Sequence, residues 1–96
     1  MTTCEWDPRK DARNRRKHGV AFAATATVLD DPFALMAFDR NLDGEDRWRM
    51  IGRAADGETL VVAVVIRDLA GGETARIISA RRALRHERLR YEQQAH

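Results

Sequence analysis

Residues 74–92, TARIISARRALRHERLRYE, change their side-chain period halfway, and this change constrains the fold more than any other feature of the sequence. From Ala75 to Ala80 the residues alternate as in a strand, which predicts Arg76 and Ser79 on opposite faces. From Arg81 onward the apolar residues recur at helical spacing, which places Arg81 at the start of a helix. No Gly or Pro separates the two patterns. We therefore expect a strand that runs almost directly into a helix.

Charge is distributed unevenly along the chain. Residues 1–22 carry six Lys and Arg against three Asp and Glu, residues 74–96 carry six against two, and residues 23–73 carry five against ten. If the two ends meet in space, they form a basic patch beside an acidic edge, and such a patch suits a polyanion. The alternative is an ordinary solvated Arg/Glu face on helices that only pack.

Length and composition place the chain among small intracellular domains. With 96 residues, of which 44% are hydrophobic, we expect a single domain over residues 1–96. Cys4 has no partner in the sequence, so neither an intrachain disulfide nor a cysteine metal site is expected, in keeping with the cytoplasm. The start of the chain lacks an apolar signal region, and the longest apolar run, Leu60–Ile66, is too short to cross a bilayer.

The rest of the chain is expected to supply two helices and three more strands. Asp7 is a good N-cap and Pro8 suits the first helical position, so a helix should run to about His18, where Gly19 ends it. A second helix is expected at residues 20–29, with Ala21 as a poor N-cap. Three strands are predicted at residues 33–38, 47–54 and 60–66. The fold class is therefore α+β: two N-terminal helices, a four-stranded antiparallel β-meander and a C-terminal helix.

Motifs of common enzyme classes are missing from the sequence. It holds no Walker A loop, no GxGxxG and no GxSxG, and its three histidines lack ligand spacing, so we expect no metal and no cofactor. What remains is a set of cations with one histidine, His18, at a helix end. Such a set can cleave RNA without a metal, since Arg and Lys stabilise phosphorane charge and imidazole exchanges protons near neutral pH. The alternatives are plain: strand arginines are usually exposed charges, and a histidine at a helix end usually complements the helix dipole.

Several short motifs occur together and in a fixed order. They are WDPRK at residues 6–10, KHGV at 17–20, DDP at 30–32, RIISAR at 76–81 and an ER-x-x-Y segment ending at Tyr91. In this combination the chain resembles the BrnT family, toxins of type II toxin–antitoxin modules. The resemblance implies a fold similar to that of RelE-like ribonuclease toxins and an endoribonuclease activity that arrests growth. It also implies a BrnA-type antitoxin whose ribbon-helix-helix part binds operator DNA.

The resemblance also implies which residues surround the scissile phosphate. The expected catalytic group is Lys17, His18, Arg47, Arg76, Ser79, Arg81 and Tyr91. Further RNA contacts are expected from Arg13, Arg16, Arg49, Arg53, Arg67, Arg82 and Arg85. No general base is evident among these residues.

Two readings from other classes stay open at this point. The chain could grip RNA or an acidic partner without chemistry, or it could be an inactive toxin that survives as a regulator. An enzyme requires the catalytic group to converge within a few ångströms, whereas a binding module requires only a spread of phosphate contacts.

Overall fold

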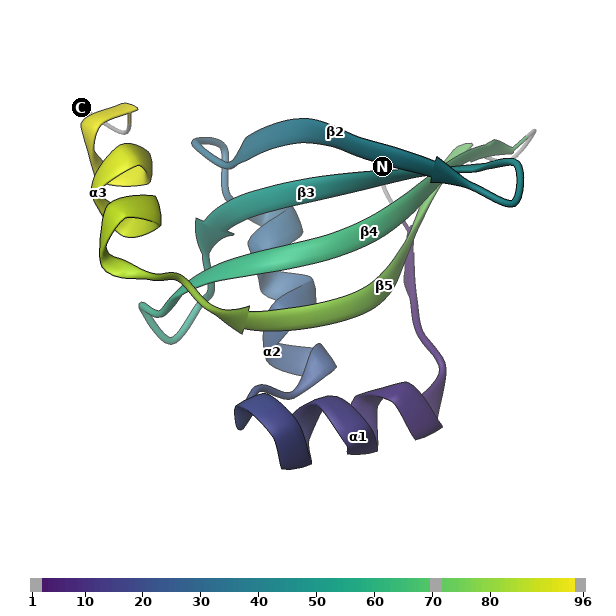
Figure 1. Cartoon of the computed structure of the whole chain (residues 1–96), viewed down its shortest axis with the longest axis horizontal. Helices are drawn as coiled ribbons and strands as arrows, with labels where there is room; N and C mark the ends of the chain where they lie inside the picture. The colour runs from purple at the N-terminus through teal and green to yellow at the C-terminus, as the bar shows by residue number, and fades with distance from the viewer. Residues whose placement is uncertain (1–2, 70–71, 95–96) are drawn as a thin grey trace.

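The computed structural model describes residues 3–69 and 72–94, which are built around a five-stranded mixed sheet (Figure 1). The strands are β1 (Thr3–Glu5), β2 (Leu35–Leu42), β3 (Glu45–Arg53), β4 (Thr59–Leu69) and β5 (Gly72–Arg82). Their order across the sheet is β1-β5-β4-β3-β2. β1 pairs with β5 in parallel, and the other neighbours are antiparallel.

The expected α+β class and C-terminal helix are correct, but the four-stranded antiparallel meander is wrong. The fifth strand, β1, lies before the first helix and pairs with the outer edge of β5, so the sheet is mixed. Three residues are too few to show an alternating pattern. Only the free edge of β5 makes a strand of them, because it supplies partners for their backbone groups.

The first helix, α1 (Pro8–His18), has the predicted ends. The carboxylate of Asp7 accepts a hydrogen bond of 2.8 Å from the backbone N–H of Arg9, and Gly19 adopts φ 70° at the C-terminal cap. The predicted start and end of this helix are therefore confirmed.

The expected second helix is divided. It consists of α2 (Phe22–Ala26) followed by a 3-10 turn, η1 (Thr27–Asp30). Ala21 provides no side-chain cap, as its sequence suggests, and the carboxylate of Asp11 in α1 accepts the Phe22 N–H at 2.9 Å instead. The hydroxyl of Thr27 accepts the backbone N–H of Ala55, which ties the start of the 3-10 turn to the β3–β4 connection.

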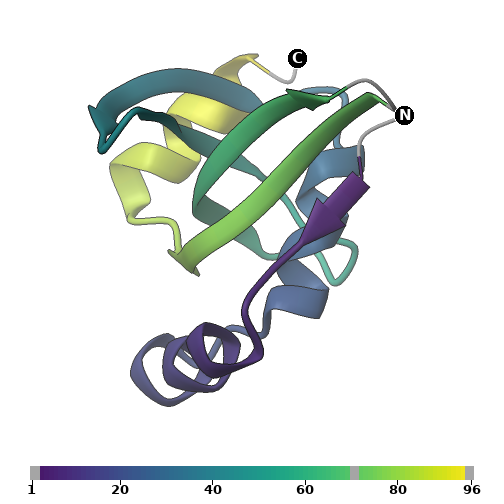
Figure 2. The ribbon, with the colours of Figure 1, turned by 90° about the vertical axis from the view of Figure 1, so that its right-hand side faces the viewer.

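The helices lie on different sides of the sheet. Figure 2 shows α2 on one side, while the last helix, α3 (Arg85–Gln94), lies on the other side at one end of the strands. The core forms beneath α2 and η1, where Phe22, Val28, Val62 and Ile77 are almost fully buried. The helical layer packs very close to β3: a Cβ at Gly52 would lie 2.7 Å from Val28 Cγ1. Among the described residues only α3 covers part of the opposite face of the sheet, and we call this face the open face.

A bulge in β5 decides which of its side chains reach the open face. Ala63 pairs with Ser79 and Val64 pairs with Ile77, so Ile78 is the extra residue. The bulge reverses the alternation, so that Arg76 and Ser79 share the open face. The prediction that they lie on opposite faces is therefore wrong.

The position of Arg81 also differs from expectation. It pairs with Val61 within β5, and α3 begins only at Arg85. The backbone N–H of Ala83 still donates to the carbonyl of Thr59, so pairing with β4 prolongs the strand past the point where the helical spacing starts. Arg81 is a strand residue that faces the open side.

None of the helices within residues 3–69 and 72–94 is long and apolar enough to span a membrane.

Candidate functional site

The open face collects polar side chains from β3 and β5. Arg49 and Ser79 both flank Ala63 of β4, and Arg47 and Arg76 both flank Val65 of the same strand, each in the register of the sheet. The small side chain of Ala63 leaves space between the polar groups of the first row.

This space is a hollow of about 340 Å³, which we call the His18 hollow. It is lined by His18, Asp39, Arg49, Val61, Ala63, Ser79, Ala80 and Arg81. A second hollow of about 220 Å³ shares His18 and Ser79 with it and extends along α1, where Lys10, Arg13 and Lys17 also line it. Of the seven expected catalytic residues, His18, Ser79 and Arg81 line the His18 hollow, and Lys17 lines the adjoining one.

The end of α1 is held against β5 by a buried side chain. Asn14 is 5% exposed; its amide donates to the backbone carbonyls of Val20 and Ala80 at 2.8 and 2.9 Å, and its oxygen accepts the Ala80 N–H at 3.1 Å. The guanidinium of Arg82 adds a hydrogen bond of 3.2 Å to the His18 carbonyl. These contacts fix the distance between His18 and Ser79.

Arg81 is fixed by a carboxylate from α3. Its guanidinium donates two hydrogen bonds to Glu87, of 2.8 and 3.0 Å, and Glu87 also accepts the backbone N–H of Leu84 at 2.8 Å. The Arg81 hydrogen bonds lower the pKa of Glu87 to about 2. Part of the Arg81 charge is therefore neutralised, but its orientation toward the hollow is set.

The other expected strand arginines form a separate group beside the hollow. Glu45 accepts hydrogen bonds from Arg67 at 2.5 Å and from Arg76 at 2.9 Å, and these arginines lower the pKa of its carboxyl, the Arg67 hydrogen bond most. The Nε atoms of Arg47 and Arg76 are buried without a hydrogen-bond partner among the described residues. We call Arg47, Arg67, Arg76 and Glu45 the Glu45 cluster.

Tyr91 is not near the hollow. It is 2% exposed, and its hydroxyl donates to Asp31 Oδ2 at 2.5 Å. Burial, followed by this hydrogen bond, raises the pKa of the phenol. The guanidinium of Arg53 lies 5.5 Å from the ring centroid. Tyr91 and Arg53 thus tie α3 to the segment before β2.

The remaining expected RNA contacts are distributed around the site. Arg13 lines the hollow along α1 and Arg49 lines the His18 hollow, whereas Arg16, Arg82 and Arg85 are exposed and line neither. Arg49 was expected only to bind RNA, and its position beside His18, Ser79 and Arg81 is more central than that.

Asp39 is the residue of the hollow that the sequence did not indicate. Its acidic segment, DRNLDGED, is typical of a turn, and the strand was expected to end at Phe38. In the structure β2 continues to Leu42, and Asp39 occupies a bulge between the pairs Phe38–Trp48 and Arg40–Arg47. The Asp43-Gly44 turn signal was the one hint that the strand could run further.

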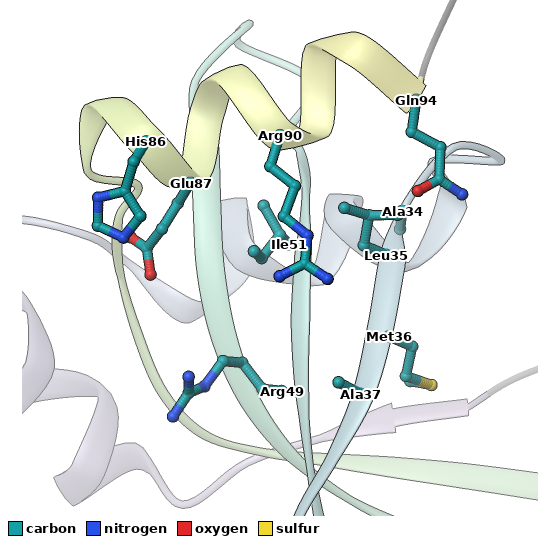
Figure 3. Close-up of a pocket in the computed structure, with 10 residues that line it drawn as sticks. All are labelled: Ala34, Leu35, Met36, Ala37, Arg49, Ile51, His86, Glu87, Arg90 and Gln94. Atoms are coloured by element: carbon teal, nitrogen blue, oxygen red, sulfur yellow. The ribbon is translucent and has the colours of Figure 1, made fainter.

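A larger groove continues from the hollow under α3 (Figure 3). Its volume is about 540 Å³, and it is lined by Ala34, Leu35, Met36, Ala37, Arg49, Ile51, His86, Glu87, Arg90 and Gln94. Arg49 lines both the groove and the His18 hollow, so the two adjoin on the open face.

Fold and site together define a small α+β protein whose open sheet face gathers Arg, Lys, His and Ser, a set suited to a phosphodiester. Residues 6–87 match the family described as ribonuclease toxin, BrnT, of type II toxin–antitoxin systems. The chain belongs to this family. It is a ribonuclease toxin, and a type II system pairs such a toxin with a protein antitoxin. None of the curated proteins compared with the chain matches it.

Proposed function

We propose that the His18 hollow is the site at which this toxin cleaves RNA, without a metal ion, and thereby arrests growth. The observation that carries the proposal is that His18, Arg49, Ser79 and Arg81 line one hollow although they come from three elements. A spread of phosphate contacts does not require such convergence, whereas catalysis does.

The hollow offers a group for each charge that develops during cleavage. When the 2′-oxygen attacks phosphorus, negative charge accumulates on the phosphorane oxygens, and Arg49 and Arg81 are positioned to stabilise it. The hydroxyl of Ser79 can donate a hydrogen bond to the same oxygens. His18 is the candidate to protonate the leaving 5′-oxygen, since imidazole is suited to general acid work.

The groups outside the hollow take other roles in this proposal. Lys17 and Arg13 bind a phosphate next to the scissile one, since they line the adjoining hollow. The Glu45 cluster takes no direct part in the cleavage, because Glu45 already engages Arg67 and Arg76 and partly neutralises their charge. Tyr91 acts only by positioning α3.

The antitoxin is proposed to be of the BrnA type, with a ribbon-helix-helix part through which the pair contacts operator DNA. The groove under α3 and the exposed outer strand β2 offer it a continuous surface beside the hollow. An antitoxin segment lying there would cover Arg49 and keep RNA out of the site.

The test is inducible expression in bacteria of the wild type and of His18→Ala, with growth and total RNA integrity read together. Arg9→Ala is the matched control, because Arg9 lies at the far end of the same helix and its side chain is 90% exposed. We expect arrest and RNA loss from the wild type and the control, and growth with intact RNA from an equally soluble His18→Ala. Purified wild-type toxin should retain cleavage in excess chelator.

His18→Ala is a sharper variant than a change at Arg81. Removing Arg81 would leave Glu87, whose side chain is 12% exposed, without its charged partner, so a loss of activity could come from the structure. If soluble His18→Ala arrests growth as the wild type does, this site is the wrong one.

A further inference from the structure

We propose that Asp39 is the general base that removes the proton from the attacking 2′-hydroxyl. This inference rests on the proposed function of the His18 hollow and supplies the group that the sequence motifs leave unassigned. Asp39 comes from β2, which is the strand farthest from β5 in the described sheet. Only the fold brings it to the site.

Pairing of β2 with β3 places the Asp39 side chain on the open face, because Asp39 follows two residues after Ala37, which lies opposite Arg49. In the register of β2 and β3, Phe38 pairs with Trp48 and Arg40 pairs with Arg47, so Asp39 is the bulged residue and has no partner on β3. Bulges of this kind are frequent beside active sites. The Asp39 side chain is 27% exposed and lines the hollow together with His18, Arg49 and Ser79.

Asp39 differs from the other carboxylates of the open face in how it is bound. Glu45 and Glu87 accept hydrogen bonds of 2.5 to 3.0 Å from arginines, and these hydrogen bonds lower the pKa of both carboxyls. Asp39 lies 3.7 Å from Arg49 and 3.4 Å from Arg40, which is too far for a short charge-assisted hydrogen bond. Among the described residues lining the hollow it is also the one carboxylate. Its oxygens are therefore available to a substrate hydroxyl.

The neighbouring arginine gives the base its orientation. Arg49 is close enough to attract the Asp39 carboxylate and lines the same hollow, so a phosphate bound by Arg49 would stand beside that carboxylate. A base must come within hydrogen-bond reach of the proton it removes, and this arrangement places the ribose next to the carboxylate.

The proposed step balances without any further reactant. The 2′-hydroxyl proton passes to Asp39, the 2′-oxygen forms a bond to phosphorus, and the bond from phosphorus to the 5′-oxygen breaks. The protonated imidazole of His18 gives its proton to the leaving oxygen. The products are a 2′,3′-cyclic phosphate and a free 5′-hydroxyl. Asp39 then releases its proton to water and His18 takes one from water, which restores both side chains.

The experiment compares purified wild type, Asp39→Asn, Asp39→Glu and Asp46→Asn in single-turnover cleavage of total RNA across pH. Asp46→Asn makes the same charge change on the same pair of strands, but Asp46 accepts from the amide of Asn41 and does not line the hollow. The charged and titratable groups that face Asp39 are Arg40 on its own strand, Arg49 on β3, His18 on α1 and Arg81 on β5. All four are unchanged in these variants.

We expect Asp39→Asn to lower the rate by about 10²- to 10⁴-fold and to flatten the rise of rate with pH on the acid side, which reports deprotonation of the base. Asp39→Glu should recover part of the rate together with that rise, and Asp46→Asn should match the wild type. The 3′ ends of wild-type fragments should carry cyclic phosphate.

Two results would overturn the role of Asp39 while leaving the ribonuclease in place. One is an Asp39→Asn rate within about threefold of wild type. The other is an equal loss at every pH with the acid-side rise preserved, which would mean that Asp39 only positions Arg49. Wild-type protein that leaves RNA intact would instead overturn the proposed site, and this inference with it.

Discussion

At the scale of single residues, the site depends on a buried amide that takes no part in the chemistry. Asn14 uses both ends of its side chain to join the end of α1 to Ala80 of β5. Lys17 and His18 follow within one helical turn, so their distance from Ser79 is set by Asn14. A buried polar group of this kind is stabilising only while all its partners are present.

We predict that Asn14→Ala lowers the free energy of unfolding by about 2–4 kcal/mol, because it leaves buried backbone groups of Val20 and Ala80 unpaired. Urea unfolding would measure the change. Arg15→Ala is the control: its side chain is 56% exposed, and its loss should change stability by less than about 0.5 kcal/mol. A change below about 1 kcal/mol for Asn14→Ala would mean that water replaces the amide.

At the scale of elements, the joint between β5 and α3 is an ion pair as well as a short connection. Glu87 accepts from Arg81 on the strand and from the Leu84 N–H at the start of the helix, in the manner of a capping box. The pKa of Glu87 falls from 4.5 to about 2, so the folded state prefers the carboxylate. Its stabilising effect is fully present above about pH 4.5 and is lost as the pH falls toward 2.

We therefore predict that Glu87→Gln lowers the free energy of unfolding by about 1–2 kcal/mol at pH 6, a range that allows for the 37% exposure of Arg81. The difference in free energy of unfolding between Glu87→Gln and the wild type should decrease as the pH falls from 4.5 to about 2. Urea midpoints at a series of pH values would show it. Glu92→Gln, which removes an exposed pair at 3.6 Å, should leave a small and nearly constant gap. A difference in unfolding free energy that does not change with pH for Glu87→Gln would contradict the link between Glu87 ionisation and stability.

At the scale of the whole molecule, the uneven charge of the sequence becomes a surface. The basic beginning and the basic end of the chain meet where α1 lies against β5, and Lys10, Arg13 and Lys17 stand beside the hollow there. Acidic residues of the middle segment are found on the hairpin of β2 and β3, where they pair with arginines or with Asn41. The side of the molecule near α1 is thus suited to receive a nucleic-acid backbone.

We predict that Arg13→Ala reduces the salt dependence of RNA binding by about 0.7 in the slope of log K against log salt, the value for one phosphate contact on a single strand. The measurement uses a uridine homopolymer and a His18→Ala background, so that binding is read without cleavage. Arg9→Ala, at the exposed far end of α1, should leave the slope unchanged. Equal slopes for all variants would place the RNA path away from α1.

The sequence by itself determined the features that rest on local interactions. The caps of α1 at Asp7 and Gly19 and the family motifs could be predicted from the sequence, because neighbours along the chain decide them. The sequence also led us to expect His18, Ser79 and Arg81 at one catalytic site. The structure places all three around one hollow, and their catalytic role is a proposal.

Only the tertiary structure decided the features that depend on pairing between distant segments. β1 is a strand because β5 offers it an edge, and Arg76 shares a face with Ser79 because Ile78 has no partner on β4. Asp39 reaches the hollow because pairing with β3 continues β2 past Phe38 and keeps Asp39 on the face of Ala37. Tyr91 lies away from the hollow because its hydroxyl bonds to Asp31. In each case a bond between residues far apart in the chain overrides the local pattern, and a local pattern carries no signal of such a bond.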